Sequence, residues 1–143
     1  MRVSEPGDER IELRPIGRVE SPLVDRGSAP KQGDEGAPEA VLVFAEAVKE
    51  GLRSLSVGAE AIVLTWLNQA DRGVLAVHPR GDLSRPQQGV FSTRSPDRPN
   101  PIGLHRVEIL AIEGMRFRVS NLEAVDGTPI LDLKPVLDRD TER

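Results

Sequence analysis

The residues best suited to chemistry lie in one short segment of the chain, GVFSTRSPDRPNPIGL, at positions 89–104. It contains three prolines, Pro96, Pro99 and Pro101. Each proline fixes its own φ and keeps the preceding residue out of the helical region, so we expect a stiff, extended loop. Such a loop loses little further entropy when it binds a ligand, and it would present Arg94 and Arg98 in a fixed arrangement. A purely structural connection between two parts of a sheet also explains these prolines.

The motifs of several common enzyme classes are missing from the sequence. Cysteine is absent, which excludes disulfides, thiolate zinc sites and a cysteine nucleophile. The two histidines, His78 and His105, have no partners at the spacing of a catalytic triad or a metal site. No serine lies in a G-x-S-x-G elbow, and neither common nucleotide-binding fingerprint occurs. We therefore predict no metal site and no serine or cysteine hydrolase.

The charge pattern predicts a basic surface around the same segment, although the whole chain is acidic. The formal net charge is -4, whereas residues 78–106 contain five arginines and two aspartates. The arginines are Arg80, Arg85, Arg94, Arg98 and Arg106. Clustered arginines bind RNA phosphates, and Arg80, Arg85 and Arg98 are the candidate RNA-binding residues. Base stacking has few candidates, because the chain has only Trp66, Phe44, Phe91 and Phe117, mostly in core-like contexts.

The distribution of apolar residues predicts an all-β fold with one short helix. Residues 61–67 form a continuous apolar run, which predicts a strand buried on both faces. Residues 105–122 predict two strands joined through Glu113 and Gly114, and Asp126 begins a predicted turn before a last extended segment. Further strands are expected at residues 11–21, 41–44, 73–79 and 89–91. Many short strands separated by Pro and Gly favour a β-barrel or a β-sandwich.

One apolar stripe has the spacing of a helix, which is predicted at residues 45–55. Its members follow one another at intervals of three and four residues, and they are Ala45, Val48, Leu52 and Leu55. Residues 22–40 are rich in Pro, Gly and charge, which predicts a long loop.

The length of 143 residues fits one domain, expected over residues 11–140 after a disordered tail at residues 1–10. No apolar run is long enough to cross a membrane, and the first ten residues lack the hydrophobic region of a signal peptide. We therefore expect a cytoplasmic protein without a membrane anchor.

Four sequence blocks resemble the signature of one known family. They are PIGRVESP at residues 15–22, APKQ at residues 29–32, GVFSTRSPDRPNPIGL at residues 89–104 and DGTPILDLKP at residues 126–135. In this order and at these separations they are similar to the blocks of the tRNA methyltransferase O (TrmO, TsaA-like) family. The resemblance implies a single β-barrel that binds S-adenosylmethionine, a homodimer, and methylation of the exocyclic nitrogen of threonylcarbamoyl-adenosine beside the tRNA anticodon.

Matching the motifs residue by residue implies a set of cofactor contacts in this chain. They are Pro30, Lys31, Gln32, Asn68, Gln69, Arg94, Leu104, Glu123, Ala124, Val125 and Asp126. Two positions depart from the family pattern, since Lys31 stands where Arg is usual and Asn68 stands where His is common. The sequence ends soon after DLKPVLDRD, so we expect the short form, without the C-terminal domain of many bacterial members. That difference bears on tRNA recognition more than on cofactor binding.

Three residues are candidates for catalysis if the resemblance holds. Asp126 and Asp132 are possible proton acceptors, and Lys134 could steer a carboxylate on the acceptor. Alternative roles are a turn for Asp126 and an ion pair between Asp132 and Lys134. Two other functions stay open: a methyltransferase for a small molecule or another RNA, and a non-catalytic S-adenosylmethionine sensor.

Overall fold

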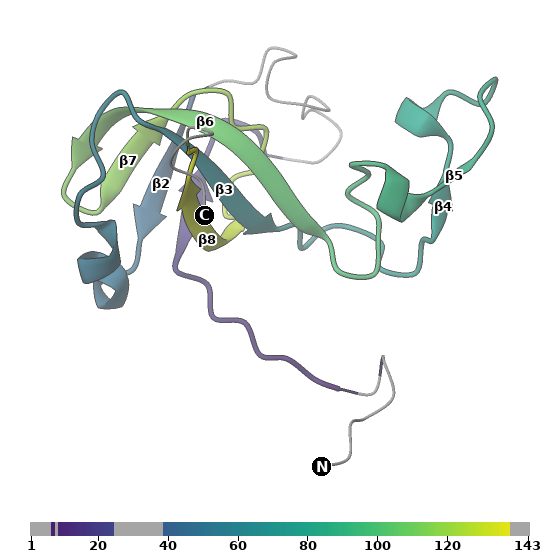
Figure 1. Cartoon of the computed structure of the whole chain (residues 1–143), viewed down its shortest axis with the longest axis horizontal. Helices are drawn as coiled ribbons and strands as arrows, with labels where there is room; N and C mark the ends of the chain where they lie inside the picture. Colours follow the sequence, from purple (N-terminus) through teal and green to yellow (C-terminus); the bar gives the residue numbers. More distant parts are fainter. Residues whose placement is uncertain (1–6, 8, 25–38, 138–143) are drawn as a thin grey trace.

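The computed structural model describes residue 7, residues 9–24 and residues 39–137. Within these ranges, six strands form one antiparallel sheet that closes into a barrel, in the order β1-β2-β7-β6-β3-β8. The strands are β1 (Gly17–Glu20), β2 (Ala40–Phe44), β3 (Glu60–Trp66), β6 (Ile102–Glu113), β7 (Arg116–Val119) and β8 (Pro129–Pro135). Strand β1 pairs with β2 on one side and with β8 on the other, which closes the sheet (Figure 1). The prediction of a mostly-β fold is confirmed.

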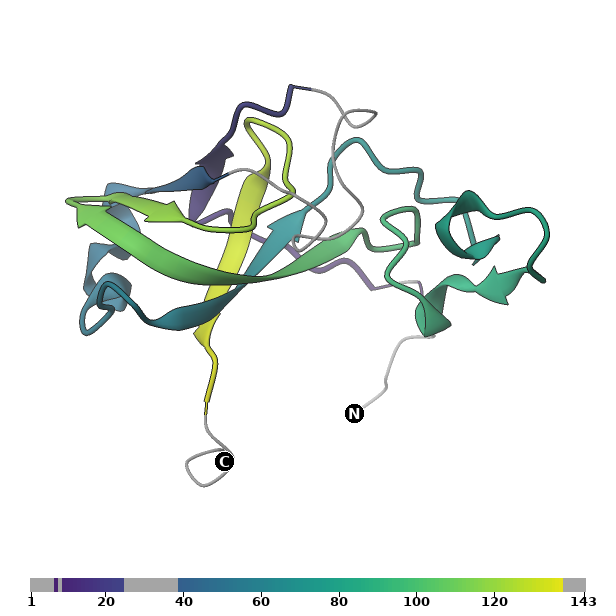
Figure 2. The same cartoon turned by 90° about the horizontal axis from the view of Figure 1, so that it is seen from above.

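A second, two-stranded sheet lies outside the barrel. Strands β4 (Ala76–Val77) and β5 (Gln88–Gly89) pair within the segment that joins β3 to β6. We call residues 67–101 the arm. Figure 2 shows the arm standing clear of the barrel strands, next to the ends of β3 and β6. The arm contains the proline-rich segment that the sequence singled out.

Alternating side chains fill the barrel. Along β6 inward and outward residues alternate over eight positions from Ile102 to Ile109, and β3 and β7 alternate in the same way. The inward residues include Val63, Val107 and Ile109, each at most 2% exposed. The rings of Phe44 and Phe117 meet edge to face, with centroids 5.2 Å apart. The predicted hairpin at residues 105–122 is confirmed by the pairing of β6 with β7.

The predicted helix at residues 45–55 is a shorter 3-10 helix, η3 (Glu46–Leu52). No residue of η3 is fully buried, although Val48 and Leu52 pack against the core from outside. The spacing of three residues between Ala45 and Val48 suits the three residues per turn of a 3-10 helix. Gly51 also weakens the preference for a longer α-helix.

Four strand predictions need correction. Residues 11–21 form a strand only at Gly17–Glu20, and residues 73–79 form one only at Ala76–Val77. Residues 61–67 are not buried on both faces, because Ile62, Leu64 and Trp66 are only half-buried on the outer wall of the barrel. Residues 89–91 were predicted as a strand, but β5 ends at Gly89 and a 3-10 turn, η5 (Val90–Ser92), follows. A continuous apolar run therefore marks a barrel strand here, with one face in the core and the other half-buried on the outer wall.

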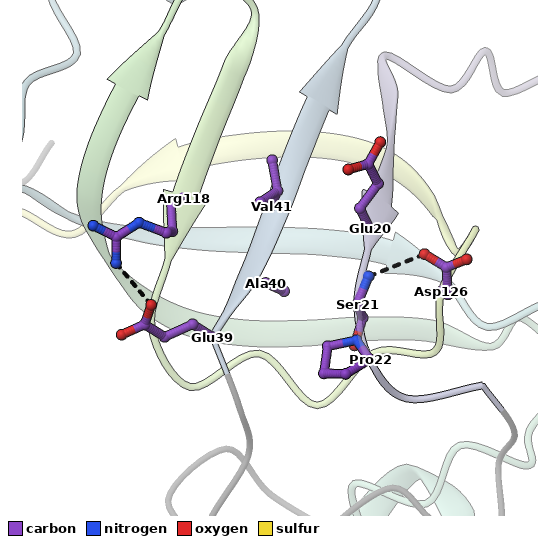
Figure 3. A pocket seen from close by; sticks show the side chains of 8 residues that line it. All are labelled: Glu20, Ser21, Pro22, Glu39, Ala40, Val41, Arg118 and Asp126. Carbon is purple, nitrogen blue, oxygen red and sulfur yellow. Dashed lines mark hydrogen bonds and ion pairs between the residues drawn. The ribbon is translucent and has the colours of Figure 1, made fainter.

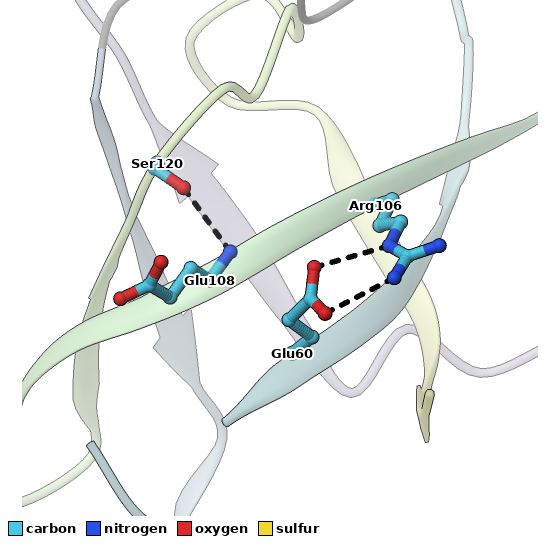
Figure 4. Close-up of polar contacts among 4 residues, drawn as sticks. All are labelled: Glu60, Arg106, Glu108 and Ser120. Atoms are coloured by element: carbon cyan, nitrogen blue, oxygen red, sulfur yellow. Dashed lines mark hydrogen bonds and ion pairs between the residues drawn. The ribbon is translucent and has the colours of Figure 1, made fainter. Parts of the chain in front are cut away.

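Ion pairs between arginine and glutamate side chains lie on the outer wall of the barrel. The Arg106 guanidinium donates to both carboxylate oxygens of Glu60, at 3.0 and 3.1 Å (Figure 4). Arg116 holds Glu20 in the same way, at 2.6 and 3.1 Å. These hydrogen bonds lower the pKa of Glu60 and the pKa of Glu20 below their ordinary value of 4.5.

In the described part of the chain, no helix is long and apolar enough to cross a membrane.

We expect these two pairs to make stability fall as the pH drops below about 4.5. A carboxyl whose pKa is lower in the folded state stabilises the fold above its unfolded pKa, and this contribution is lost as the pH falls through the folded pKa. The effect is small because both pairs are exposed. Thermal denaturation of the Glu20→Gln, Glu60→Gln double variant should show a shallower loss of Tm with acidity. Glu108→Gln is the control, because the Glu108 carboxylate makes no ion pair with a described residue (Figure 4).

Candidate functional site

The proline-rich loop of the arm is braced by its own arginine. The Arg98 guanidinium donates to the carbonyl oxygens of Val90 at 2.8 Å, Ser95 at 2.9 Å and Thr93 at 3.2 Å. Arg98 is half-buried as a result. An RNA phosphate would have to compete with three carbonyls for these donors, so RNA binding by Arg98 stays a prediction.

A second arginine, which the sequence reasoning missed, ties the start of the arm to its end. Arg72 donates from Nε to the carbonyl oxygen of Pro99 at 2.6 Å, and its guanidinium lies over the Trp66 ring, 5.1 Å from the centroid. The backbone N–H of Asp71 donates to Oδ1 of Asp97 at 2.9 Å. The segment that enters the arm, at residues 71–72, is therefore held against the segment that leaves it, at residues 97–99.

Other arginines of the arm point outward. Arg94 is exposed and makes no hydrogen bond or ion pair with a described residue. Arg80 and Arg85 are also exposed, and the carbonyl of Arg85 is hydrogen-bonded to Nδ1 of His78 at 2.8 Å. Phe91 is 77% exposed and is the exception among the aromatic residues, most of which were expected in core-like contexts. The reason is that η5 turns Phe91 outward while its neighbour Val90 is buried.

The remaining predicted cofactor contacts fall in three places. Asn68 and Gln69 follow β3 at the start of the arm and are both exposed. Leu104 lies on the outer side of β6 and is 46% exposed. The segment with Pro30, Lys31 and Gln32 lies outside the described residues.

The turn before β8 holds the last four predicted contacts, from Glu123 to Asp126. Ala124 is buried at 1% exposure, whereas Asp126 is exposed. Oδ1 of Asp126 accepts from the backbone N–H of Ser21 at 3.0 Å, and the Asp126 N–H donates to the Leu23 carbonyl at 2.7 Å. Asp126 thereby borders an open pocket of about 660 Å³ beside the ends of β1 and β2 (Figure 3). The predicted turn role of Asp126 is confirmed, and its catalytic role stays a prediction.

A chain of hydrogen-bonded polar side chains links strands β3 and β6 to this turn. Nε2 of His105 lies 2.7 Å from Oγ1 of Thr65, and Nδ1 of His105 lies 2.8 Å from Oε1 of Glu123. Thr65 is 0% and His105 is 5% exposed. The sequence offers His105 no partner at a familiar spacing. The alternation along β6, which places His105 on the same side as Val107, is the signal that indicates an inward position.

The other two candidate catalytic residues lie elsewhere. Nζ of Lys134 and Oδ2 of Asp132 are 3.1 Å apart, so the predicted ion pair is confirmed. In the register of β8 against β3, these residues face Ile62 and Leu64, which are on the outer wall. Among described residues, the hydrogen-bond partners of Asp126 are Ser21 and Leu23, so the structure does not bring the three candidates together.

No group of three or more His, Asp or Glu side chains within residues 9–24 and 39–137 has an arrangement that could hold a metal ion.

Comparison with known proteins identifies relatives along most of the chain. Residues 18–140 match the family described as the tRNA-methyltransferase O N-terminal domain. A probable S-adenosyl-L-methionine-binding protein of Methanothermobacter thermautotrophicus is 43% identical over 128 residues, which cover 90% of this chain and 91% of that protein. An S-adenosyl-L-methionine-binding protein of Archaeoglobus fulgidus is 42% identical over 122 residues, or 85% of this chain and 86% of that protein.

Solved structures give the same result. The crystal structure of TrmO from Pseudomonas aeruginosa superimposes with a TM-score of 0.72 at 26% identity, covering 97% of this chain. This chain spans 62% of the length of that protein. The match over residues 18–140 includes the barrel strands, the arm and the turn before β8. The chain therefore belongs to the family of the tRNA-methyltransferase O N-terminal domain.

Proposed function

We propose that this chain binds S-adenosylmethionine and transfers a methyl group to tRNA, with the exocyclic nitrogen of threonylcarbamoyl-adenosine as the acceptor. The observation that carries the proposal is the family match over residues 18–140. The printed names of two relatives, which describe S-adenosyl-L-methionine-binding proteins, support the cofactor. Because the chain spans 62% of the solved TrmO, the acceptor rests on the family rather than on a full-length match.

The polar side chains among the predicted contacts suit such a cofactor. Arg94 has no partner among the described residues, and its planar donors match the carboxylate of a methionine moiety. The carboxylates of Glu123 and Asp126 offer acceptors for hydroxyl or ammonium groups. Leu104, 46% exposed on β6, offers an apolar contact. When bound, the cofactor supplies an electrophilic methyl group on a positively charged sulfur.

The arm, held by its own hydrogen bonds, is suited to keep the two reactants of a methyl transfer in position. A methyl transfer of this kind is an in-line displacement, and holding the two reactants in position accounts for much of its acceleration. Arg98 and Arg72 fix the arm through hydrogen bonds to its backbone. Asp126 would take the proton that the acceptor nitrogen loses. Asp132 is less suited to this step because it is engaged with Lys134 on the outer wall.

Further features support a tRNA partner and a homodimer. The exposed side chains of Arg80, Arg85 and Arg94 give the arm positively charged groups that suit RNA phosphates. Three large apolar side chains of the arm are exposed and offer apolar surface to a second copy of the chain: Leu75 at 64%, Leu83 at 78% and Phe91 at 77%. We include in the proposal that the protein works as a homodimer in the cytoplasm, where tRNA is found.

A second candidate function is S-adenosylmethionine binding without catalysis, or transfer to a small molecule. The names of the relatives state only binding, and the net charge of -4 does not favour a nucleic acid over the whole surface. A sensor would use the same cofactor contacts and would need no proton acceptor.

Transfer of a labelled methyl group separates these functions. We expect the protein to label total tRNA when given methyl-tritiated S-adenosylmethionine, and Asp126→Asn to lower that rate by about 100-fold, as loss of a general base does. Asn keeps the side-chain oxygen that accepts from Ser21, so the turn should survive. Asp132→Asn is the matched control and should retain most of the activity. Cofactor binding without label in any acceptor fraction would support the sensor and overturn the transfer.

A further inference from the structure

We propose that Thr65 and His105 are positioning residues, which hold the Glu123 carboxylate in the orientation in which it receives hydrogen bonds from the cofactor. The inference rests on the proposed function for what Glu123 binds. The juxtaposition that carries it is a chain of three polar side chains that runs from the interior of the barrel to the turn before β8.

The interior end of this polar chain, formed by Thr65 and His105, is tightly enclosed. Thr65 on β3 lies opposite Gly103 on β6, and His105 follows two residues later on the same inward side. A Cβ atom on Gly103 would lie 2.5 Å from Oγ1 of Thr65 and 2.7 Å from Nε2 of His105. Only a residue without a side chain therefore fits at position 103 while the Thr65 and His105 contact is kept.

The polar chain lies among mostly apolar buried residues. The surrounding core cluster contains Val63, Val107 and Ile130, which are at most 2% exposed. A buried hydrogen-bonded network gives little stability compared with apolar residues of similar volume, because its groups must first leave water. What such a network adds is a fixed direction for each of its members. Here the member at the surface is a carboxylate.

The two hydrogen-bond partners of His105 indicate which ring nitrogen donates and which accepts. An ionised carboxylate can only accept, so the hydrogen shared with Glu123 belongs to Nδ1 of His105. In the neutral ring, Nε2 then accepts from the hydroxyl of Thr65. Each ring nitrogen has one partner, and no buried side-chain polar atom among the described residues lacks a hydrogen bond. The ring therefore cannot turn without losing two bonds.

The outer end of the polar chain is the Glu123 carboxylate, which a ligand can reach. The Glu123 side chain is 16% exposed, and only its Oε1 is hydrogen-bonded to a described residue. The second oxygen, Oε2, has no hydrogen bond to a described residue. Because every buried side-chain polar atom among these residues has a partner, Oε2 must reach the surface. A carboxylate with one oxygen anchored and the other directed outward suits a donor such as a ribose hydroxyl or an ammonium group. S-adenosylmethionine carries both kinds of donor.

Calorimetric titration with S-adenosylmethionine tests the inference. We expect His105→Leu and Thr65→Val each to weaken the affinity, by roughly tenfold for His105→Leu, the effect of one hydrogen bond. Thr65→Ser should restore it, because the hydroxyl returns. In a Glu123→Gln background, His105→Leu should cost little further affinity, since the residue it positions is already changed. Val107→Ala is the matched control: it removes buried volume on the same strand but takes part in neither hydrogen bond of the polar chain.

The outcomes are distinguishable. Unchanged affinity in His105→Leu and Thr65→Val, or an equal loss in Val107→Ala, would overturn the positioning role while leaving the proposed function intact. Failure of the unmodified protein to bind S-adenosylmethionine would overturn both. A nitrogen-15 NMR spectrum of the histidine rings gives a readout that does not depend on the cofactor. We expect the Nδ1 hydrogen of His105 to exchange slowly in the unmodified protein and quickly in Glu123→Ala.

Discussion

Gly17→Ala is expected to destabilise the fold by about 3 kcal/mol, at the upper end of the usual cost of overpacking. Gly17 pairs with Phe44 on β2 and with Ile130 on β8, so it lies where the sheet closes. A Cβ atom at this position would collide with the carbonyl oxygen of Val43 and lie 3.0 Å from Cα of Phe44. These are backbone atoms, which cannot move aside as a flexible side chain can.

Urea denaturation of Gly17→Ala and Gly51→Ala measures this effect against a matched control. A Cβ atom on Gly51 would meet nothing within 4 Å, so its replacement should leave the stability unchanged or raise it by up to about 1 kcal/mol. Equal midpoints for the two variants would show that the seam between β1 and β2 tolerates a side chain. That result would contradict the closed pairing described for β1.

Arg94→Ala is expected to weaken S-adenosylmethionine binding by about 10- to 100-fold without lowering the stability, the cost of a lost hydrogen bond to a charged group. The reason for unchanged stability is that Arg94 makes no hydrogen bond with a described residue. Calorimetry and thermal denaturation on the same sample measure both quantities. A loss of affinity below twofold would remove Arg94 from the proposed site.

Arg98→Ala provides the contrast, because its guanidinium serves the loop itself. Removing it takes one donor from each of the carbonyls of Val90, Thr93 and Ser95, of which Val90 keeps the N–H and the hydroxyl of Thr93. We expect faster hydrogen exchange across residues 90–100 and a weaker affinity as a secondary effect. Arg98→Lys should not restore protection, because a single ammonium group cannot reproduce a planar fork that reaches three acceptors. Unchanged exchange in Arg98→Ala would show that the prolines alone hold the loop.

The hairpin of β6 and β7 could be predicted because its signal is local. Inward and outward residues alternate along each strand, and the turn follows Glu113. The turn at Asp126 could be predicted for the same reason, since Gly127 supplies the positive φ of 85°. The helix at residues 45–55 could be located but not typed, because a short apolar stripe with spacings of three and four fits both a 3-10 helix and an α-helix.

The buried chain from Thr65 to Glu123 could not be predicted from spacing. Its members are 40 and 18 residues apart, and only the pairing of β3 with β6 and the path of the turn bring them together. The rigid loop around Arg98 could be predicted, but the residue types do not show that its donors turn back onto carbonyls of that loop. Exposure of Phe91 depends on the 3-10 turn η5, where the pattern at residues 89–91 predicted a strand.

The most direct test of the account is the mass of one nucleoside. Transfer RNA from cells that lack this protein would be incubated with the purified chain and S-adenosylmethionine, digested to nucleosides and analysed by mass spectrometry. The account predicts a gain of one methyl group on threonylcarbamoyl-adenosine, and no gain when the cofactor is left out. An unchanged nucleoside, with cofactor binding confirmed by calorimetry in the same preparation, would contradict the proposed transfer to tRNA.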